Sequence, residues 1–185
     1  MLKELEQTSN VERYIQVANR LDDILASQQK PLFQRNEQWI ASTRKASKAK
    51  YEQLESDMKT FRLNLIKENI RVGLNQLGDY YFSSGDLANA LKSYSKVKDN
   101  CMTQKHFLEM YFDIIKVSLA LGNYIHVQSF IVKVESLSDV PDKELVATKR
   151  NSVTGIINLL TSAYRKAARN FLDIKFVNSH AVFQV

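Results

Sequence analysis

The sequence predicts an all-α protein, in which helical hairpins repeat along the chain as an α-solenoid and follow a long polar helix. Only five glycines and two prolines occur among 185 residues, which is fewer turn residues than a β-sandwich or a barrel needs. No stretch sustains the two-residue alternation of a half-buried strand. Apolar side chains instead recur every three or four residues, and the turns between such segments repeat after 37 residues.

Composition and charge narrow the class of protein. The chain is 44% hydrophobic and 25% charged, as folded domains are, and its net charge of +6 permits an acidic partner or nucleic acid without deciding between them. The single cysteine, Cys101, excludes an internal disulfide and fits a reducing compartment. No apolar run is long enough for a membrane span, and the first ten residues do not resemble a signal peptide. We therefore expect a protein of the cytoplasm and nucleus without membrane contact.

Residues 1–35 form the first predicted segment, with one or two short helices. Ser9 and Glu12 have the spacing of a capping box, and apolar positions follow at helical spacing until Pro31 interrupts them. Residues 36–62 predict one long polar helix, which begins near Asn36 and carries a thin apolar stripe. The chain therefore reaches its repeats through a helix that is mostly solvated.

Residues 63–175 are predicted to carry the hairpins. Gly85 ends the first of these helices in a left-handed conformation, and Asp86 caps the next helix. A third helix ends at Gly122. The apolar face of the first helix is predicted to consist of Leu63, Ile66, Ile70, Leu74, Leu77 and Tyr81.

Three further helices follow, one from Tyr124, one after Pro141 and one from Tyr164. Residues 176–185 show no helical face and are left as an unassigned tail. The face of the helix after Pro141 is expected to consist of Leu145, Ser152, Ile156, Leu159 and Ala163.

The turns define a repeat, because Gly85 and Gly122 lie 37 residues apart and the register continues to Tyr164. A period of 34–40 residues with two antiparallel helices is typical of tetratricopeptide-like repeats. Gly78 and Ala90 are predicted to lie where the two helices of the hairpin cross. Any helical hairpin needs small residues at such a crossing. Tyr81 and Tyr94 are predicted to fill the space between hairpins. The other two units match more loosely. The pattern positions of the first unit are Leu74, Leu77, Gly78, Tyr81, Ala90 and Tyr94.

Residues that could carry chemistry are sparse. His106, His126 and His180 each lie away from a second ligand at metal-binding spacing, and Cys101 and His106 are five residues apart, a poor helical pair. Cys101 also lacks an identifiable base and orienting group. The glycines near residue 75 lie inside a predicted helix rather than in a phosphate-binding loop. We expect no enzyme activity, no metal, no cofactor and no small-molecule substrate.

One local charge feature stands out, because residues 44–50 contain four positive charges and no acid: Arg44, Lys45, Lys48 and Lys50. On a helix, Arg44 and Lys48 share a face. One interpretation is a docking stripe for an acidic surface or for nucleic-acid phosphates. The other is a polar helix kept soluble by lysine. Nucleic acid is the less favoured partner, since the stretch offers no aromatic, Asn or Gln side chain for base readout.

Several stretches together resemble the subunit 1 family of the COP9 signalosome. Within the repeats they are IKENIR at 66–71, LGDYY at 77–81, GDLANALKSYS at 85–95, DNC at 99–101, IKVS at 115–118 and KVES at 133–136. Upstream, Trp39 with residues 43–45 and 54–59 is similar to the long helix before the repeats in that family. The resemblance covers about residues 36–172. A homologous lid subunit of the 26S proteasome shares this architecture, but GDLANALKSYS and IKVS are more similar to the signalosome form.

The resemblance implies a non-catalytic scaffold subunit of the complex that removes the ubiquitin-like modifier Nedd8 from cullins. Its partners would be other signalosome subunits and components of cullin-RING ubiquitin ligases. In that family the helical repeats precede a PCI domain with a winged helix, and a different subunit holds the zinc-dependent isopeptidase. Since the sequence ends at Val185, we expect no PCI winged helix within it. A proteasome-lid-type fragment and a basic helical adaptor for nucleic acid are the alternatives.

Overall fold

A computed structural model describes residues 5, 6 and 8–174 of the chain, so the unassigned tail at 176–185 lies outside the described residues. The chain divides into two compact units, residues 1–100 and 101–185, which are considered separately below. The described residues form α-helices and one 3₁₀ turn, with no strand among them. This confirms the all-α prediction.

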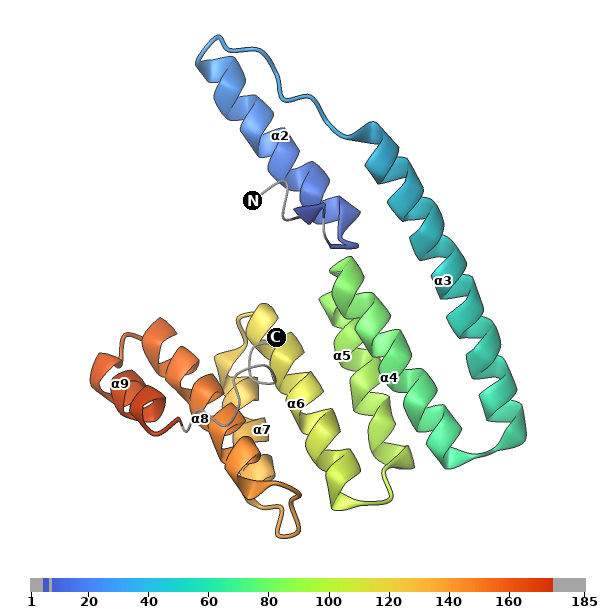
Figure 1. Cartoon of the computed structure of the whole chain (residues 1–185), viewed down its shortest axis with the longest axis vertical. Coiled ribbons are helices and arrows are strands. Elements are labelled where there is room, and N and C mark those ends of the chain that lie inside the picture. The colour runs from blue at the N-terminus through green and yellow to red at the C-terminus, as the bar shows by residue number, and fades with distance from the viewer. Residues whose placement is uncertain (1–4, 7, 175–185) are drawn as a thin grey trace. The chain divides into compact units, whose positions relative to one another are not determined.

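Between residues 8 and 100 the first unit has four α-helices, whose arrangement is drawn in Figure 1. A side-chain oxygen starts three of them: Asn10, Asn36 and Asp86 each accept a hydrogen bond from the backbone N–H three residues later. The predicted cap at Ser9 is therefore wrong by one residue, because Asn10 accepts the bond from Arg13 at 2.9 Å. The helices are α2 (Val11–Ser27), α3 (Glu37–Asn64), α4 (Lys67–Ser84) and α5 (Leu87–Lys96), and α5 continues into the 3₁₀ turn η1 (Val97–Asn100).

The connection between α2 and α3 is fixed by side chains of α2. Asp22 accepts hydrogen bonds from the Phe33 backbone and from Arg35, both at 2.8 Å. Tyr14 is fully buried, and its hydroxyl accepts a hydrogen bond from the Asn36 backbone at 3.1 Å. Its ring also packs on Trp39, with 4.9 Å between centroids. These contacts hold the connection between α2 and α3 in place, where the sequence predicts only that Pro31 interrupts the helix.

The boundary between α3 and α4 differs from the prediction. Leu63 belongs to the last turn of α3 and is 83% exposed, so it does not share a buried face with Leu74. The reason is a helix break at Leu65, whose backbone adopts the left-handed conformation at φ 54°. The new helix starts one residue after Ile66, with a different orientation.

Two glycines let α4 pack closely on both sides. A Cβ atom at Gly73 would collide with the Met58 sulfur and lie 3.0 Å from the Phe61 ring, both on α3. A Cβ atom at Gly78 would collide with Cε1 of the Tyr94 ring on α5 and lie 2.7 Å from the two adjacent ring carbons. Real Cβ atoms do not approach this closely, so both neighbours require glycine where they stand. The helix therefore forms the middle layer of α3, α4 and α5.

The described part of the second unit, residues 101–174, folds into two helical hairpins (Figure 1). Thr103, Asn123 and Asp142 cap their helices with side-chain oxygens. Asn123 and Asp142 are caps that the sequence analysis does not identify. The helices are α6 (Gln104–Ala120), α7 (Tyr124–Glu135), α8 (Lys143–Leu160) and α9 (Tyr164–Leu172).

The face predicted for α8 is wrong. Ile156 and Leu159 are 40% and 49% exposed, whereas Gly155 and Ile157 are buried. Ala163 does not belong to α8, because it is the residue that precedes α9. Two of the three buried residues of α8, Thr148 and Gly155, are polar or small, so apolar spacing indicates the wrong side of the helix.

All three hairpins make the same turn. The backbone N–H of Asp86, Asn123 and Ala163 each donates to the carbonyl five residues earlier, at 2.9, 2.9 and 2.7 Å. The residue before each of them is left-handed: Gly85 at φ 86°, Gly122 at φ 71° and Ser162 at φ 61°. This is the Schellman arrangement, repeated after 37 and then 40 residues. The third turn was not recognised from the sequence because a serine occupies the glycine position.

The crossing within each hairpin repeats as well. The first hairpin pairs Gly78 with Tyr94, and the third pairs Gly155 with Phe171, whose ring lies 2.5 Å from a hypothetical Gly155 Cβ. The equivalent positions of the second hairpin are Ile115 and Ile131, and both are buried. The crossing thus combines either a glycine with an aromatic ring or two side chains of middle size. In the first and third hairpins the two residues at the crossing are therefore packed against each other without room for a larger pair.

Candidate protein-interaction surface

Helix α3 exposes most of its length to solvent. It is 28 residues long, yet only Ile40, Leu54 and Met58 are buried. Polar and charged residues cover the rest, as predicted for residues 36–62. An isolated helix of this composition would gain little from its own apolar face, so its packing on α2 and α4 holds it in place.

The four cations of the basic stretch do not share one face. Arg44 and Lys48 lie four residues apart on the side of α3 that faces α2 and α4. Lys50 is two residues beyond Lys48, which places it about 200° further around the helix. Lys45 is about 60° from Lys48 but does not line the space between these helices. Lys45 and Lys50 are exposed, and neither forms an ion pair with another described residue.

The two cations on the inner side have weak partners. Arg44 donates to Glu12 of α2 at 2.7 Å, and Lys48 lies 3.9 Å from Glu52. The side chains of both pairs, Arg44 with Glu12 and Lys48 with Glu52, are more than half exposed. Exposed ion pairs of this kind contribute little to stability, so a partner's carboxylate can replace Glu12 at small cost.

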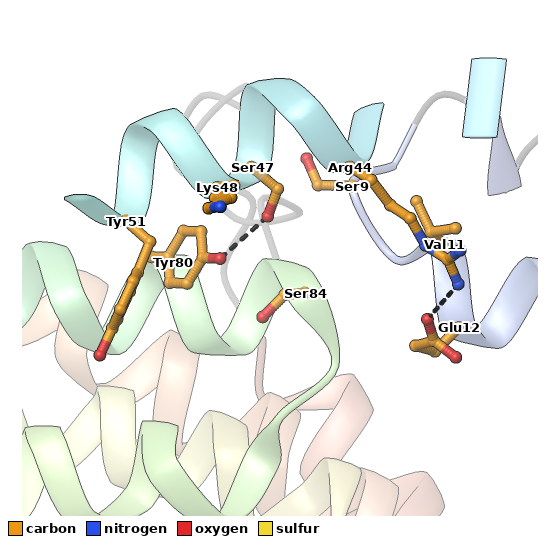
Figure 2. Close-up of a pocket in the computed structure, with 9 residues that line it drawn as sticks. All are labelled: Ser9, Val11, Glu12, Arg44, Ser47, Lys48, Tyr51, Tyr80 and Ser84. Atoms are coloured by element: carbon orange, nitrogen blue, oxygen red, sulfur yellow. Dashed lines mark hydrogen bonds and ion pairs between the residues drawn. The ribbon is translucent and has the colours of Figure 1, made fainter. Parts of the chain in front are cut away.

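These cations border a groove of about 310 Å³ between the start of α2, the middle of α3 and the end of α4 (Figure 2). Figure 2 shows the Arg44–Glu12 pair at one end and the Tyr51 and Tyr80 rings at the other. The Ser47 and Tyr80 hydroxyls share a hydrogen bond of 2.9 Å across it. The lining residues are Ser9, Val11, Glu12, Arg44, Ser47, Lys48, Tyr51, Tyr80 and Ser84.

Tyr51 and Tyr80 form the aromatic end of the groove, and Tyr81 packs against both of them. The Tyr51 ring lies 5.6 Å from Tyr80 and 6.1 Å from Tyr81, and Tyr80 and Tyr81 meet edge to face. The Tyr51 hydroxyl accepts from Tyr81 at 3.5 Å and donates to Glu55 at 2.7 Å. These hydrogen bonds, first with Tyr81 and then with Glu55, raise the pKa of Tyr51 above its ordinary value, and burial adds to the effect. Tyr51 therefore remains a neutral hydrogen-bonding group.

The groove has the side chains of a recognition surface. It holds cations, hydroxyls and neutral phenols, and its lining contains no nucleophile paired with a base. Such a mixture suits a peptide segment with acidic and apolar side chains. Tyrosine and arginine are also the residues most often found at strong protein contacts.

Two histidines of the second unit are held by hydrogen bonds within it. No group of three or more His, Cys, Asp or Glu residues there could hold a metal ion. His126 is hydrogen-bonded through Nδ1 to the buried Ser118 hydroxyl at 2.8 Å, and its ring packs on Phe130. His106 Nδ1 accepts from the Met102 backbone at 3.5 Å. His180 lies outside the described residues.

No helix in the described ranges is long and apolar enough to cross a membrane.

The residues of the predicted repeat pattern differ in burial and in the helices that they contact. Leu74, Ala90 and Tyr94 are buried and Leu77 is partly buried. Tyr94 packs on Gly78 inside its own hairpin, and its hydroxyl donates to Asp79 at 2.6 Å. Tyr81 instead meets the Tyr51 ring of α3. Gly85 and Gly122 occupy left-handed turn positions.

Some residues of this surface could not be recognised from the sequence. The groove joins Glu12 to Arg44 and Ser47 to Tyr80, pairs that are 32 and 33 residues apart. Nothing in the local spacing signals these pairs. The Asn10 side chain likewise lies against Gly85, which holds the start of α2 near the turn between α4 and α5. The only available signal was the cluster of tyrosines at 80 and 81.

Comparison with known proteins gives a consistent result. Residues 36–181 match the family described as 26S proteasome subunit RPN7. The chain is 40% identical over 153 residues to COP9 signalosome complex subunit 1b of Drosophila melanogaster, which covers 80% of this chain and 29% of that protein. It is 31% identical over 171 residues to COP9 signalosome complex subunit 1 of Arabidopsis thaliana, covering 92% and 38%.

A proteasome subunit is similar over a shorter region. The 26S proteasome non-ATPase regulatory subunit 6 of Caenorhabditis elegans is 25% identical over 100 residues, which is 54% of this chain and 24% of that protein. The resemblance to COP9 signalosome subunit 1 is therefore confirmed. The chain spans about a third of the length of the signalosome relatives it matches.

Proposed function

Because this chain belongs to the 26S proteasome subunit RPN7 family, we propose that it acts as a non-catalytic scaffold subunit of the COP9 signalosome type. In this role it binds other signalosome subunits and components of cullin-RING ubiquitin ligases. It thereby supports cullin deneddylation by an active site in a different subunit. We place this function in the cytoplasm and nucleus.

The observation that carries the proposal is the exposed surface of α3 beside the groove. Only three side chains of this 28-residue helix are buried, so most of its surface is free to meet another protein. It is nevertheless fixed at both ends, by the Tyr14 and Asn36 contact and by Met58 against Gly73. A rigid, polar surface with a ready basic edge supports binding and positioning of a neighbouring protein.

The groove supplies the chemistry of this contact. Arg44 and Lys48 attract carboxylates, and the tyrosines provide flat apolar area with neutral hydroxyls. An incoming Asp or Glu replaces Glu12 at Arg44, which exchanges one exposed ion pair for one at a drier interface. We therefore propose an acidic segment of a partner subunit as the occupant of the groove.

A second candidate is a subunit of the proteasome-lid type. The matching family is described by a proteasome subunit, and one relative is a proteasome regulatory subunit. The mode of action would be the same, with a different set of partners. A nucleic-acid adaptor has less support, because the four cations lie on different sides of α3.

Affinity purification from the organism's own cells, followed by quantitative mass spectrometry, distinguishes these candidates. Signalosome subunits recovered in equal amounts with the chain support the proposal. Proteasome lid subunits in that place support the second candidate. Recovery of neither set contradicts both.

A pair of charge variants tests the groove itself. Arg44→Glu with Lys48→Glu should reduce recovery of the partner subunits, since both side chains border the groove. Lys45→Glu with Lys50→Glu changes the net charge equally on the same helix but outside the groove, and should leave recovery near the wild-type level. Equal losses in both variants would indicate a general charge effect and would remove the groove from the proposal.

A further inference from the structure

Three large apolar side chains are exposed where α3 meets α4. Leu63 is 83% exposed, Leu65 is 80% exposed and Ile66 is 51% exposed. We name Leu63, Leu65 and Ile66 the apolar corner. Single exposed apolar residues are common on protein surfaces, but three large apolar residues within four positions form a patch.

The backbone of the corner adds a second observation. Leu65 adopts φ 54°, a left-handed conformation that L-residues with branched side chains disfavour. Two of the chain's other turns place glycine at this conformation, at Gly85 and Gly122. Glycine at position 65 would relieve the strain and remove exposed apolar area together. Of the four non-glycine residues with positive φ in the described ranges, the other three are the polar Gln29, Asp142 and Ser162. Stability of the fold therefore does not explain the leucine, and backbone strain of this kind concentrates at functional sites.

The charges around the corner indicate what binds there. Residues 58–67 contain three cations, Lys59, Arg62 and Lys67, and no acid. All three are exposed, and none forms an ion pair with another described residue. Glu68, the next acid along the chain, is hydrogen-bonded to Arg71 at 2.9 and 2.7 Å. The corner thus combines an apolar centre with an uncompensated positive rim.

We propose that the apolar corner inserts into an apolar cleft of a partner protein whose edge carries carboxylates. Strong protein contacts have this anatomy, with an apolar anchor at the centre and polar groups around it. The inference extends the proposed function and rests on its premise that the chain binds neighbouring subunits. It adds a contact separate from the groove, because Leu63 lies 15 residues beyond Lys48, or about 22 Å along α3.

Photo-cross-linking tests the proposal in the protein's own cells. Benzoylphenylalanine replaces Leu63 in the full chain, and mass spectrometry identifies the peptide that becomes attached. The matched control carries the same group in place of Ile125, which is also 83% exposed but lies on α7. We expect one partner peptide from position 63, with apolar residues flanked by Asp or Glu, that position 125 does not capture.

The rim is tested with Lys59→Glu, Arg62→Glu and Lys67→Glu in the cross-linking chain. Loss of the electrostatic contacts should lower the yield of that cross-link by about tenfold, equivalent to about 1.4 kcal/mol of binding. Circular dichroism of the purified variant checks that the helices are retained. The substitutions lie at exposed positions, so the fold should be unaffected.

Four results would overturn the inference. These are attachment to phospholipid, attachment to a second copy of the chain, no yield above the Ile125 control, and an unchanged yield in the rim variant. A failure of the proposed function is a separate result. In that case the wild-type chain recovers neither signalosome nor lid subunits, while position 63 still captures an acidic partner peptide.

Discussion

Substitution of Gly78 by alanine has two opposing effects on stability, a gain in helix propensity and a steric clash, and the structure shows which is larger. Alanine in a helix interior is favoured over glycine by about 1 kcal/mol. At this site, however, the added Cβ would lie 2.7 Å from Cδ1 and Cζ of Tyr94, about 1 Å inside ordinary carbon contact. The ring cannot move freely, because it is 1% exposed and its hydroxyl is bound to Asp79 at 2.6 Å.

The steric effect should prevail. Overpacking a buried site costs about 1–3 kcal/mol, and the restrained ring places Gly78→Ala in the upper part of that range. After the propensity gain, we expect a net loss of about 1–2 kcal/mol, consistent with those two ranges. Urea unfolding followed by circular dichroism at 222 nm measures this loss as a lower midpoint.

The second hairpin suggests the control. It carries Ile115 and Ile131 at the positions of Gly78 and Tyr94, so isoleucine fits this kind of crossing. In a Tyr94→Ile background the ring is absent, and Gly78→Ala should then be neutral or stabilising. The two substitutions should couple by about 2–3 kcal/mol, near the upper end for residues in contact. A stabilising Gly78→Ala in the wild-type chain, or the same effect in both backgrounds, would refute this reasoning.

The remaining predictions concern turns and pH. Ser162→Gly should raise the free energy of unfolding by about 0.5–1 kcal/mol, because glycine relieves the left-handed backbone at φ 61°; a lower urea midpoint would contradict this. Gly122→Ala should lower it by about 1 kcal/mol through conformation alone, since an added Cβ meets no atom within 4 Å; an unchanged midpoint would show that the turn is not left-handed. The hydrogen bonds of Asp22 with Arg35 and Phe33 lower the pKa of Asp22 below its ordinary value of 3.8. The stabilisation from Asp22 should therefore be complete above that pH and disappear as the pH falls below it. The free energies of unfolding of the wild type and of Asp22→Asn at several acidic pH values measure this. A difference between the two proteins that stays constant with pH would show that Asp22 does not cause the pH dependence.

The helices and their turns were largely predictable, because the signals are local. Gly85, Asp86 and Gly122 mark turn positions by residue type, and the structure places them there. Ser162 occupies the same position with an unfavourable residue type, so the third turn carried no signal. Leu63 and Ile66 continued the apolar spacing of α4, and only the break at Leu65 removes them from its buried face.

The candidate surface was less predictable, because it depends on contacts between distant residues. The basic stretch was visible in the sequence, but its division into two sides of α3 follows from which side faces α2 and α4. The partner of Arg44 lies 32 residues away on another helix. The Gly155 and Phe171 crossing was missed for a similar reason, since its identity is clear only after the three hairpins are aligned on their turns.

Lysine labelling of the free chain and of its assembled complex tests the central claim, that the groove side of α3 binds a partner subunit. An amine-reactive acetylating reagent modifies exposed lysines, and mass spectrometry measures the rate at each site. We predict that assembly strongly slows labelling of Lys48, which borders the groove, and leaves labelling of Lys50 on the other side of the helix nearly unchanged. A complex that forms while Lys48 reacts as fast as in the free chain would contradict the account.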